Sequence, residues 1–198
     1  MEAHKDYIGS KMGMWIFLLS EVLLFGGLFI LYSAYRFKFR GDFHLAAMEL
    51  NTILGTLNTL ILLTSSLTMA LSIASIRKGH RVSSLGYLAV TVVLGLLFLG
   101  NKYVEWSAKL GHGLYPNSPT LLERSSGEIL FFGLYYAMTG LHGLHVVVGV
   151  GLLAVMCFLL VRGRIQSADF ILLENSGLYW HLVDIIWIFL FPLFYLIT

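Results

Sequence analysis

Long apolar runs separated by short polar connections form the pattern of this sequence. A helix needs about 20 apolar residues to cross a bilayer, and five segments are long enough: residues 13–36, 52–76, 85–106, 128–160 and 178–198. The connections between them are too short to form a soluble domain. The pattern therefore predicts an all-α, polytopic membrane protein, a bundle of five transmembrane helices that forms a single domain over residues 1–198.

The fourth segment differs from the others in length and in glycine content. A helix over residues 128–160 would be about 50 Å long, which exceeds the hydrocarbon layer, so this helix must tilt or project into water. Four glycines would let neighbouring helices approach it closely: Gly140, Gly143, Gly149 and Gly151. We therefore expect this helix at the centre of the bundle.

Composition supports a membrane location and excludes several partners. Apolar residues make up 58% of the chain and charged residues 12%, and the mean hydropathy is +0.81, far from the values of soluble domains. The 13 basic residues form no stripe that could follow a phosphate backbone, so we expect no nucleic acid partner. Cys157 is the only cysteine, which excludes an intrachain disulfide and a cysteine-based metal site.

Lysine and arginine in the connections indicate an orientation. If the spans alternate in direction, seven basic residues share one side: Lys5, Lys11, Arg77, Lys78, Arg81, Arg162 and Arg164. Five lie on the other side: Arg36, Lys38, Arg40, Lys109 and Arg124. Because cytoplasmic connections carry the excess of positive charge, this bias favours a cytoplasmic N-terminus.

One carboxylate interrupts the first span near its middle. Glu21 lies eight residues beyond Gly13, about 12 Å along a helix, so neither end of the span gives it easy access to water. A charge at this depth costs about 3 kcal/mol. Two interpretations remain: Glu21 is a protonated acid bonded to a neighbouring helix, or it belongs to a proton or lipid pathway.

The second and third spans carry polar residues for which we expect structural roles. Asn58 is placed to hydrogen-bond across helices. Lys102 and Glu105 are three residues apart, and Glu105 and Lys109 four apart, which suits pairing at the membrane interface. Their long side chains can reach the headgroups from a helix end, and Trp106 is typical of an interfacial anchor.

Imidazoles and carboxylates also occur in the last two spans. The fourth span has His142 and His145 three residues apart, with Glu128 about four turns earlier, and the fifth has His181 and Asp184 three residues apart, flanked by two tryptophans, Trp180 and Trp187. His142, His145, His181 and Asp184 could in principle compose a metal site, but no spacing joins the two spans. Hydrogen bonds between helices or to lipid headgroups explain them more simply, and we expect no metal.

Three motifs in order resemble one family. They are MWIFLLSEVLLFGG at residues 14–27, TGLHGLHV at 139–146 and YWHLVDIIWIFLF at 179–191, and residues 58–70 fit the same pattern. Together they resemble subunit III of haem-copper oxidases, the cytochrome c oxidase type, in its five-helix bacterial form. The resemblance covers nearly the whole chain.

The resemblance implies a supporting role in aerobic respiration and electron transport. A subunit III of this kind holds no haem or copper itself; it packs against subunit I, which carries the redox centres, beside subunit II and small subunits, and it binds phospholipid. Glu21 matches the family's membrane carboxylate that reacts with dicyclohexylcarbodiimide, a reagent selective for protonated acids. The implied role is to sustain proton uptake into subunit I during proton translocation, in the bacterial cytoplasmic (inner) membrane with a cytoplasmic N-terminus.

Two alternatives stay open. The chain also resembles the subunit III-like accessory protein of some nitric oxide reductases, notably at residues 101–127. A different class is a stand-alone proton-coupled carrier that uses Glu21 and the histidines, although the sequence lacks the internal repeats of many transporters. Family members often have an arginine nearer the histidine motif than Arg162 or Arg164, so lipid-phosphate contacts are not transferred to these two residues.

Overall fold

The computed structural model describes residues 7–197, and this part of the chain folds into seven helices. Their bounds are α1 Tyr7–Lys38, α2 Arg40–Met48, α3 Thr52–Arg77, α4 Arg81–Gly111, α5 Pro119–Leu122, α6 Ser126–Val161 and α7 Ile171–Tyr195. Five of them, α1, α3, α4, α6 and α7, are long and apolar enough to cross a membrane. The predictions of an all-α fold and of five transmembrane helices are confirmed.

Several helices extend beyond the predicted spans or begin before them. The third span extends over Arg81–Gly111 rather than residues 85–106, and the first begins at Tyr7. The fifth begins at Ile171 and ends at Tyr195; Thr198, its predicted end, lies outside the described residues. A helix does not end where the hydrocarbon ends, because its backbone groups still need partners and the helix continues to supply them through the headgroup region.

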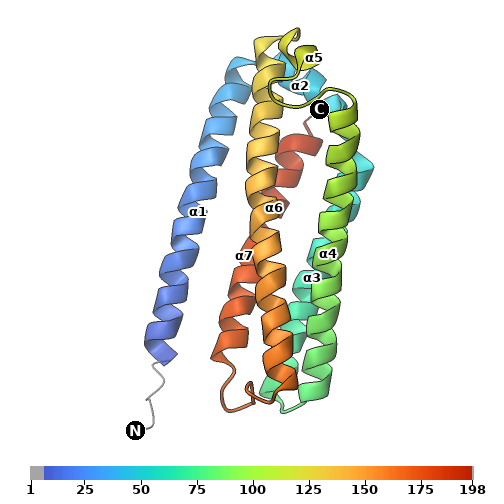
Figure 1. Cartoon of the computed structure of the whole chain (residues 1–198). Coiled ribbons are helices and arrows are strands. Elements are labelled where there is room, and N and C mark those ends of the chain that lie inside the picture. Colours follow the sequence, from blue (N-terminus) through green and yellow to red (C-terminus); the bar gives the residue numbers. More distant parts are fainter. Residues whose placement is uncertain (1–6, 198) are drawn as a thin grey trace.

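Four of the spans form a closed ring, and the fifth stands beside it. Helix α3 packs on α4 and α7, and α6 packs on the same two helices, so α3, α4, α6 and α7 surround a common interior. Figure 1 shows α1 at one edge, next to α6 and α7, with its N-terminal end standing away from the others. In the most apolar window of α1 only 11% of residues are buried, against 50% in α7.

The fourth span, expected at the centre of the bundle, is α6. It contacts α1, α2, α4, α5 and α7, as a central helix would, although α7 is the more deeply buried span. Of the glycines expected to allow close approach, two do so: a Cβ at Gly149 would lie 2.8 Å from the Trp180 ring, and a Cβ at Gly140 3.2 Å from the Trp106 ring. Gly143 and Gly151 face open space. Small residues permit close packing only on the side where a neighbouring helix lies, and the sequence does not mark that side.

The basic residues fall at two ends of the bundle as the alternation of spans requires. Helices α1, α4 and α7 start at the lower end in Figure 1, and α3 and α6 start at the upper end. At the lower end, Glu174 pairs with Lys11 at 2.9 Å and also with Arg77. Lys5 lies outside the described residues.

Candidate functional site

Glu21 of α1 bonds to His145 of α6. Its Oε2 atom lies 2.9 Å from His145 Nε2, and the two side chains are 15% and 13% exposed. The other ring nitrogen, Nδ1, lies 2.8 Å from the Leu141 carbonyl oxygen. A carbonyl oxygen can only accept, so Nδ1 carries a proton. Carboxyl and imidazole therefore share one further proton, as an acid donating to a neutral ring or as a carboxylate accepting from a charged ring. In both forms the pair has zero net charge, which suits its depth in a membrane.

Aromatic rings surround this pair. The Phe25 ring meets His145 edge-on with 5.3 Å between centroids, and Tyr179 stacks on it at 6.4 Å. The Tyr179 hydroxyl donates to the His145 backbone oxygen at 3.1 Å. These contacts fix the imidazole in front of α1, so the Glu21–His145 bond is the polar connection between α1 and α6 in the middle of the spans.

Cavities lie on both sides of α1. One, of about 470 Å³, is lined by Glu21, His145 and Tyr179, by Asn175 and Ser176, and otherwise by apolar side chains of α1, α6 and α7. The second, of about 290 Å³, is almost wholly apolar and includes His181 in its wall. An apolar groove with a few polar groups suits a lipid chain better than a polar substrate.

His142 lies in a different environment from His145, although only three residues separate them. Its side chain is fully buried in the four-helix ring, where the Phe98 and Trp187 rings lie 5.7 and 5.3 Å away between centroids. Neither ring nitrogen has a hydrogen-bond partner among the described residues. The sequence predicts both histidines on adjoining parts of one helix face. In the structure His142 points into the four-helix ring, whereas His145 points toward α1.

His181 and Asp184 of α7 face α3 and the bundle interior. His181 Nδ1 lies 2.8 Å from the Ser66 hydroxyl. Asp184 is 2% exposed, and neither carboxylate oxygen has a hydrogen-bond partner in the described part of the chain. Across residues 7–197 no three His, Cys, Asp or Glu side chains lie close enough together to hold a metal ion, so the structure does not assemble the four-residue set considered from the sequence.

The remaining predicted residues make contacts between or at the ends of helices. Asn58 is fully buried, and its Oδ1 accepts from Asn101 Nδ2 at 3.0 Å across α3 and α4. Trp180 donates through Nε1 to the Ser65 hydroxyl at 3.0 Å. Glu128 stands in the first turn of α6, where the Ser125 hydroxyl accepts from its backbone N–H at 3.3 Å.

The prediction that Lys102 and Glu105 reach the interface was wrong, because both point into the ring. Lys102 Nζ donates to Glu105 Oε2 at 3.0 Å and to the hydroxyls of Tyr135 and Tyr195 at 3.1 and 2.9 Å. These two tyrosines donate in turn to Glu105 Oε1, at 2.8 and 2.6 Å. The side chains of Lys102 and Glu105 are 9% and 4% exposed. We call these four residues the lysine network.

A signal for this burial is present in the sequence. The inward face of α4 repeats every three or four residues, and its buried positions are Ser84, Leu88, Thr91, Gly95, Phe98, Lys102, Glu105 and Lys109. The charged residues thus continue the inward stripe of the apolar ones. Their partners could not be found this way, because Tyr135 and Tyr195 lie on other helices. Trp106, expected as an interfacial anchor, packs its ring against Tyr136 at 5.2 Å between centroids.

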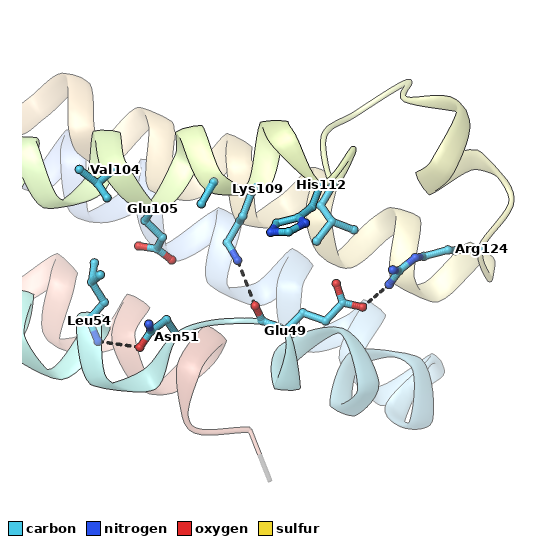
Figure 2. A pocket seen from close by; sticks show the side chains of 10 residues that line it. Glu49, Asn51, Leu54, Val104, Glu105, Lys109, His112 and Arg124 are labelled. Carbon is cyan, nitrogen blue, oxygen red and sulfur yellow. Dashed lines mark hydrogen bonds and ion pairs between the residues drawn. The ribbon is translucent and has the colours of Figure 1, made fainter.

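A larger cavity, of about 670 Å³, opens at the upper end of the bundle, and Glu105 of the lysine network lines it. Figure 2 shows Lys109 reaching across it to the backbone oxygen of Glu49, at 3.2 Å, and Arg124 bonded to the Glu49 carboxylate. Arg124 also pairs with Glu128 at 2.9 Å. The hydrogen bond to Glu49 and that to Glu128 raise the pKa of the Arg124 guanidinium. Arg124 therefore stays charged, and its charge is already paired with two carboxylates of the chain.

Comparison with known proteins agrees with this membrane bundle. The family model described as "Cytochrome c oxidase subunit III" matches residues 3–198. The chain therefore belongs to the cytochrome c oxidase subunit III family of haem-copper oxidases, and it is a multi-pass membrane protein of the respiratory chain.

Three relatives illustrate the range of this similarity. "Cytochrome c oxidase subunit 3" of Thermostichus vulcanus is 33% identical over 196 residues, covering 98% of this chain and 90% of the relative. "Probable quinol oxidase subunit 3" of Staphylococcus haemolyticus is 30% identical, covering 95% and 89%. "Heme-copper oxidase subunit I+III" of Aeropyrum pernix is 31% identical over 98% of this chain, but the match spans only 23% of that longer protein.

Proposed function

We propose that this chain is the redox-inactive subunit III of a haem-copper terminal oxidase and that it packs directly on subunit I. Its family membership carries the proposal. The fused relative from Aeropyrum pernix, named as subunit I+III, supports the contact, because both subunits are parts of one chain there. Haem and copper then belong to the partner subunits, with subunit II and any small subunits completing the complex.

The chain supports proton uptake by subunit I through the region of Glu21. The observation that favours this role is the Glu21–His145 bond, in which one proton is shared within a neutral pair. Such a pair can hold a proton at mid-membrane without a net charge. The chain thus assists the proton chemistry of a neighbouring subunit and does not reduce oxygen itself.

Phospholipid occupies the groove beside α1 in this proposal. Its support is the cavity of about 470 Å³ that is lined by Glu21 and His145 and by apolar side chains of α1, α6 and α7. A bound acyl chain would fill the space that the sparse packing of α1 leaves open, and so hold α1 in place.

The membrane is the bacterial cytoplasmic membrane, with the N-terminus in the cytoplasm. Among residues 7–197, six lysines and arginines lie at or beyond the lower ends of the spans (Lys11, Arg77, Lys78, Arg81, Arg162 and Arg164) and five toward the upper ends (Arg36, Lys38, Arg40, Lys109 and Arg124). The more positive side of a membrane protein normally faces the cytoplasm.

Purification of the tagged full chain from membranes tests this function. We expect a complex that contains a haem-bearing subunit I and consumes oxygen. Purification with a haem protein that turns over nitric oxide but not oxygen would assign the chain to a nitric oxide reductase. If the chain purifies alone and drives proton flux after reconstitution, the carrier alternative replaces the proposal.

A further inference from the structure

The bend between α1 and α2 forms a cavity whose charged side chains are all basic. It measures about 590 Å³ and is lined by Ser33, Arg36, Phe37, Arg40, His44 and Ile197. We call it the arginine cavity. Arg36 lies in the last turn of α1, and Arg40 begins α2 after the single residue Phe39. The two guanidinium groups therefore enter one hollow from either side of the bend.

Neither arginine of this cavity has a carboxylate partner among the described residues. The ion pairs formed by residues 7–197 involve Lys11, Arg77, Lys102, Arg124 and His145. Arg40 lies over the Phe37 ring, 5.6 Å from its centroid. The acid nearest in sequence, Asp42, is directed elsewhere, because its side chain packs against Gly127 at the start of α6.

The cavity of Figure 2 lies at the same end of the bundle and shows the contrast. There Arg124 is bonded to the carboxylates of Glu49 and Glu128, and Lys109 donates to a backbone oxygen. The cations of that cavity are neutralised by the chain itself. In the arginine cavity no carboxylate of residues 7–197 pairs with either arginine, so the site is open to an anion from outside this part of the chain.

The surroundings indicate which anion fits. Arg36 lies in the last turn of a membrane-spanning helix, where we expect the lipid headgroups. Two large apolar side chains of α1 near it are exposed: Phe37 by 78% and Ile30 by 73%. Guanidinium groups bind phosphate oxygens with two parallel hydrogen bonds. A phosphate at the arginines with acyl chains along Ile30 and Phe37 matches both parts of this surface.

We propose that the arginine cavity binds the phosphate of an anionic phospholipid, with Arg36 and Arg40 as its ligands. This site lies at the upper end of α1, whereas the groove at Glu21 lies at the middle of the spans. The inference requires only that the chain sits in a membrane, so it stands independently of the role in oxygen reduction.

The test is lipid binding by the delipidated complex in which the full chain purifies. Native mass spectrometry measures the binding of phosphatidylglycerol to the wild type, to R36Q/R40Q and to a matched control, K38Q/K78Q, which loses the same charge without touching the cavity. We expect one phosphatidylglycerol to bind about ten-fold more weakly to R36Q/R40Q, since each lost phosphate contact weakens binding, and the control to behave as the wild type.

Three results would overturn the proposal. An equal loss of lipid binding in K38Q/K78Q would show that general surface charge, and not the arginine cavity, binds the lipid. Equal binding of phosphatidylcholine would remove the preference for an anionic lipid. Tight binding of inorganic phosphate, with no additional affinity for phosphatidylglycerol, would identify free phosphate as the ligand.

A second measurement uses the wild type and does not depend on the folding of a variant. Phenylglyoxal modifies accessible arginines, and peptide mass spectrometry locates the modified positions. We expect phosphatidylglycerol to protect Arg36 and Arg40 but not Arg164, which lies at the opposite end of the bundle. Unchanged modification of Arg36 and Arg40 in the presence of this lipid would contradict the site, whether or not the complex is an oxidase.

Discussion

Two polar regions within the spans, the lysine network and Glu21, differ in their position in the bundle and in the number of hydrogen bonds they make. The lysine network lies inside the four-helix ring, where Lys102 donates three hydrogen bonds and Glu105 accepts two more from tyrosines. Glu21 makes a single bond, to His145, on the least buried span and next to a cavity. Glu105 also lines a cavity, that of Figure 2, so the two regions differ in their bonds. The difference teaches that a charge in a membrane span is structural where an ion pair and several hydrogen bonds satisfy it, and available for function where a single bond holds it.

Removal of Glu105 has the largest expected effect. Glu105→Ala leaves the Lys102 ammonium buried without its carboxylate, which should cost about 3–5 kcal/mol of folding free energy. Thermal unfolding of the purified complex, or loss of the chain from membranes, measures this. The double variant Lys102→Met with Glu105→Leu is the control and should recover most of the stability. If Glu105→Ala alone is as stable as the wild type, the lysine network is not structural.

The four-helix ring should tolerate an added methyl group less well than α1 does. Gly149→Ala places a methyl group 2.8 Å from the Trp180 ring in the tightly packed ring and should cost about 1–3 kcal/mol. The matched control is Gly26→Ala on α1, where no atom lies within 4 Å of the new Cβ. We expect Gly26→Ala to be neutral or slightly stabilising. Equal destabilisation by both variants would show that α1 is packed as tightly as the ring.

Glu21→Gln should have a small effect on stability, below about 1 kcal/mol. The amide nitrogen can donate to His145 Nε2 as a protonated acid would, so the bond to α6 is kept. Assembly and oxygen reduction should stay largely intact in the purified complex. Loss of the chain from the complex, or negligible turnover, would contradict the interpretation of Glu21 as a supporting residue.

The sequence was sufficient to predict the five spans, because backbone groups in lipid must form their hydrogen bonds within a helix. An apolar run of sufficient length has no other stable form there. It also identified Glu21 as unusual. It did not predict the His145 bond or the inward direction of Lys102 and Glu105. In a span that is apolar all round, hydrophobicity does not distinguish the protein-facing side from the lipid-facing side. Partners on other helices follow from tertiary packing alone.

Labelling of the intact complex with dicyclohexylcarbodiimide tests this comparison most directly. The reagent requires a protonated acid that it can reach, and peptide mass spectrometry distinguishes Glu21 from Glu105. We predict that Glu21 is labelled and that Glu21→Gln abolishes the labelling of this chain. Glu105 should stay unlabelled, because its carboxylate is paired with the Lys102 ammonium at 3.0 Å and carries no acid proton. Labelling of Glu105, or an unlabelled Glu21 in the wild type, would contradict the account.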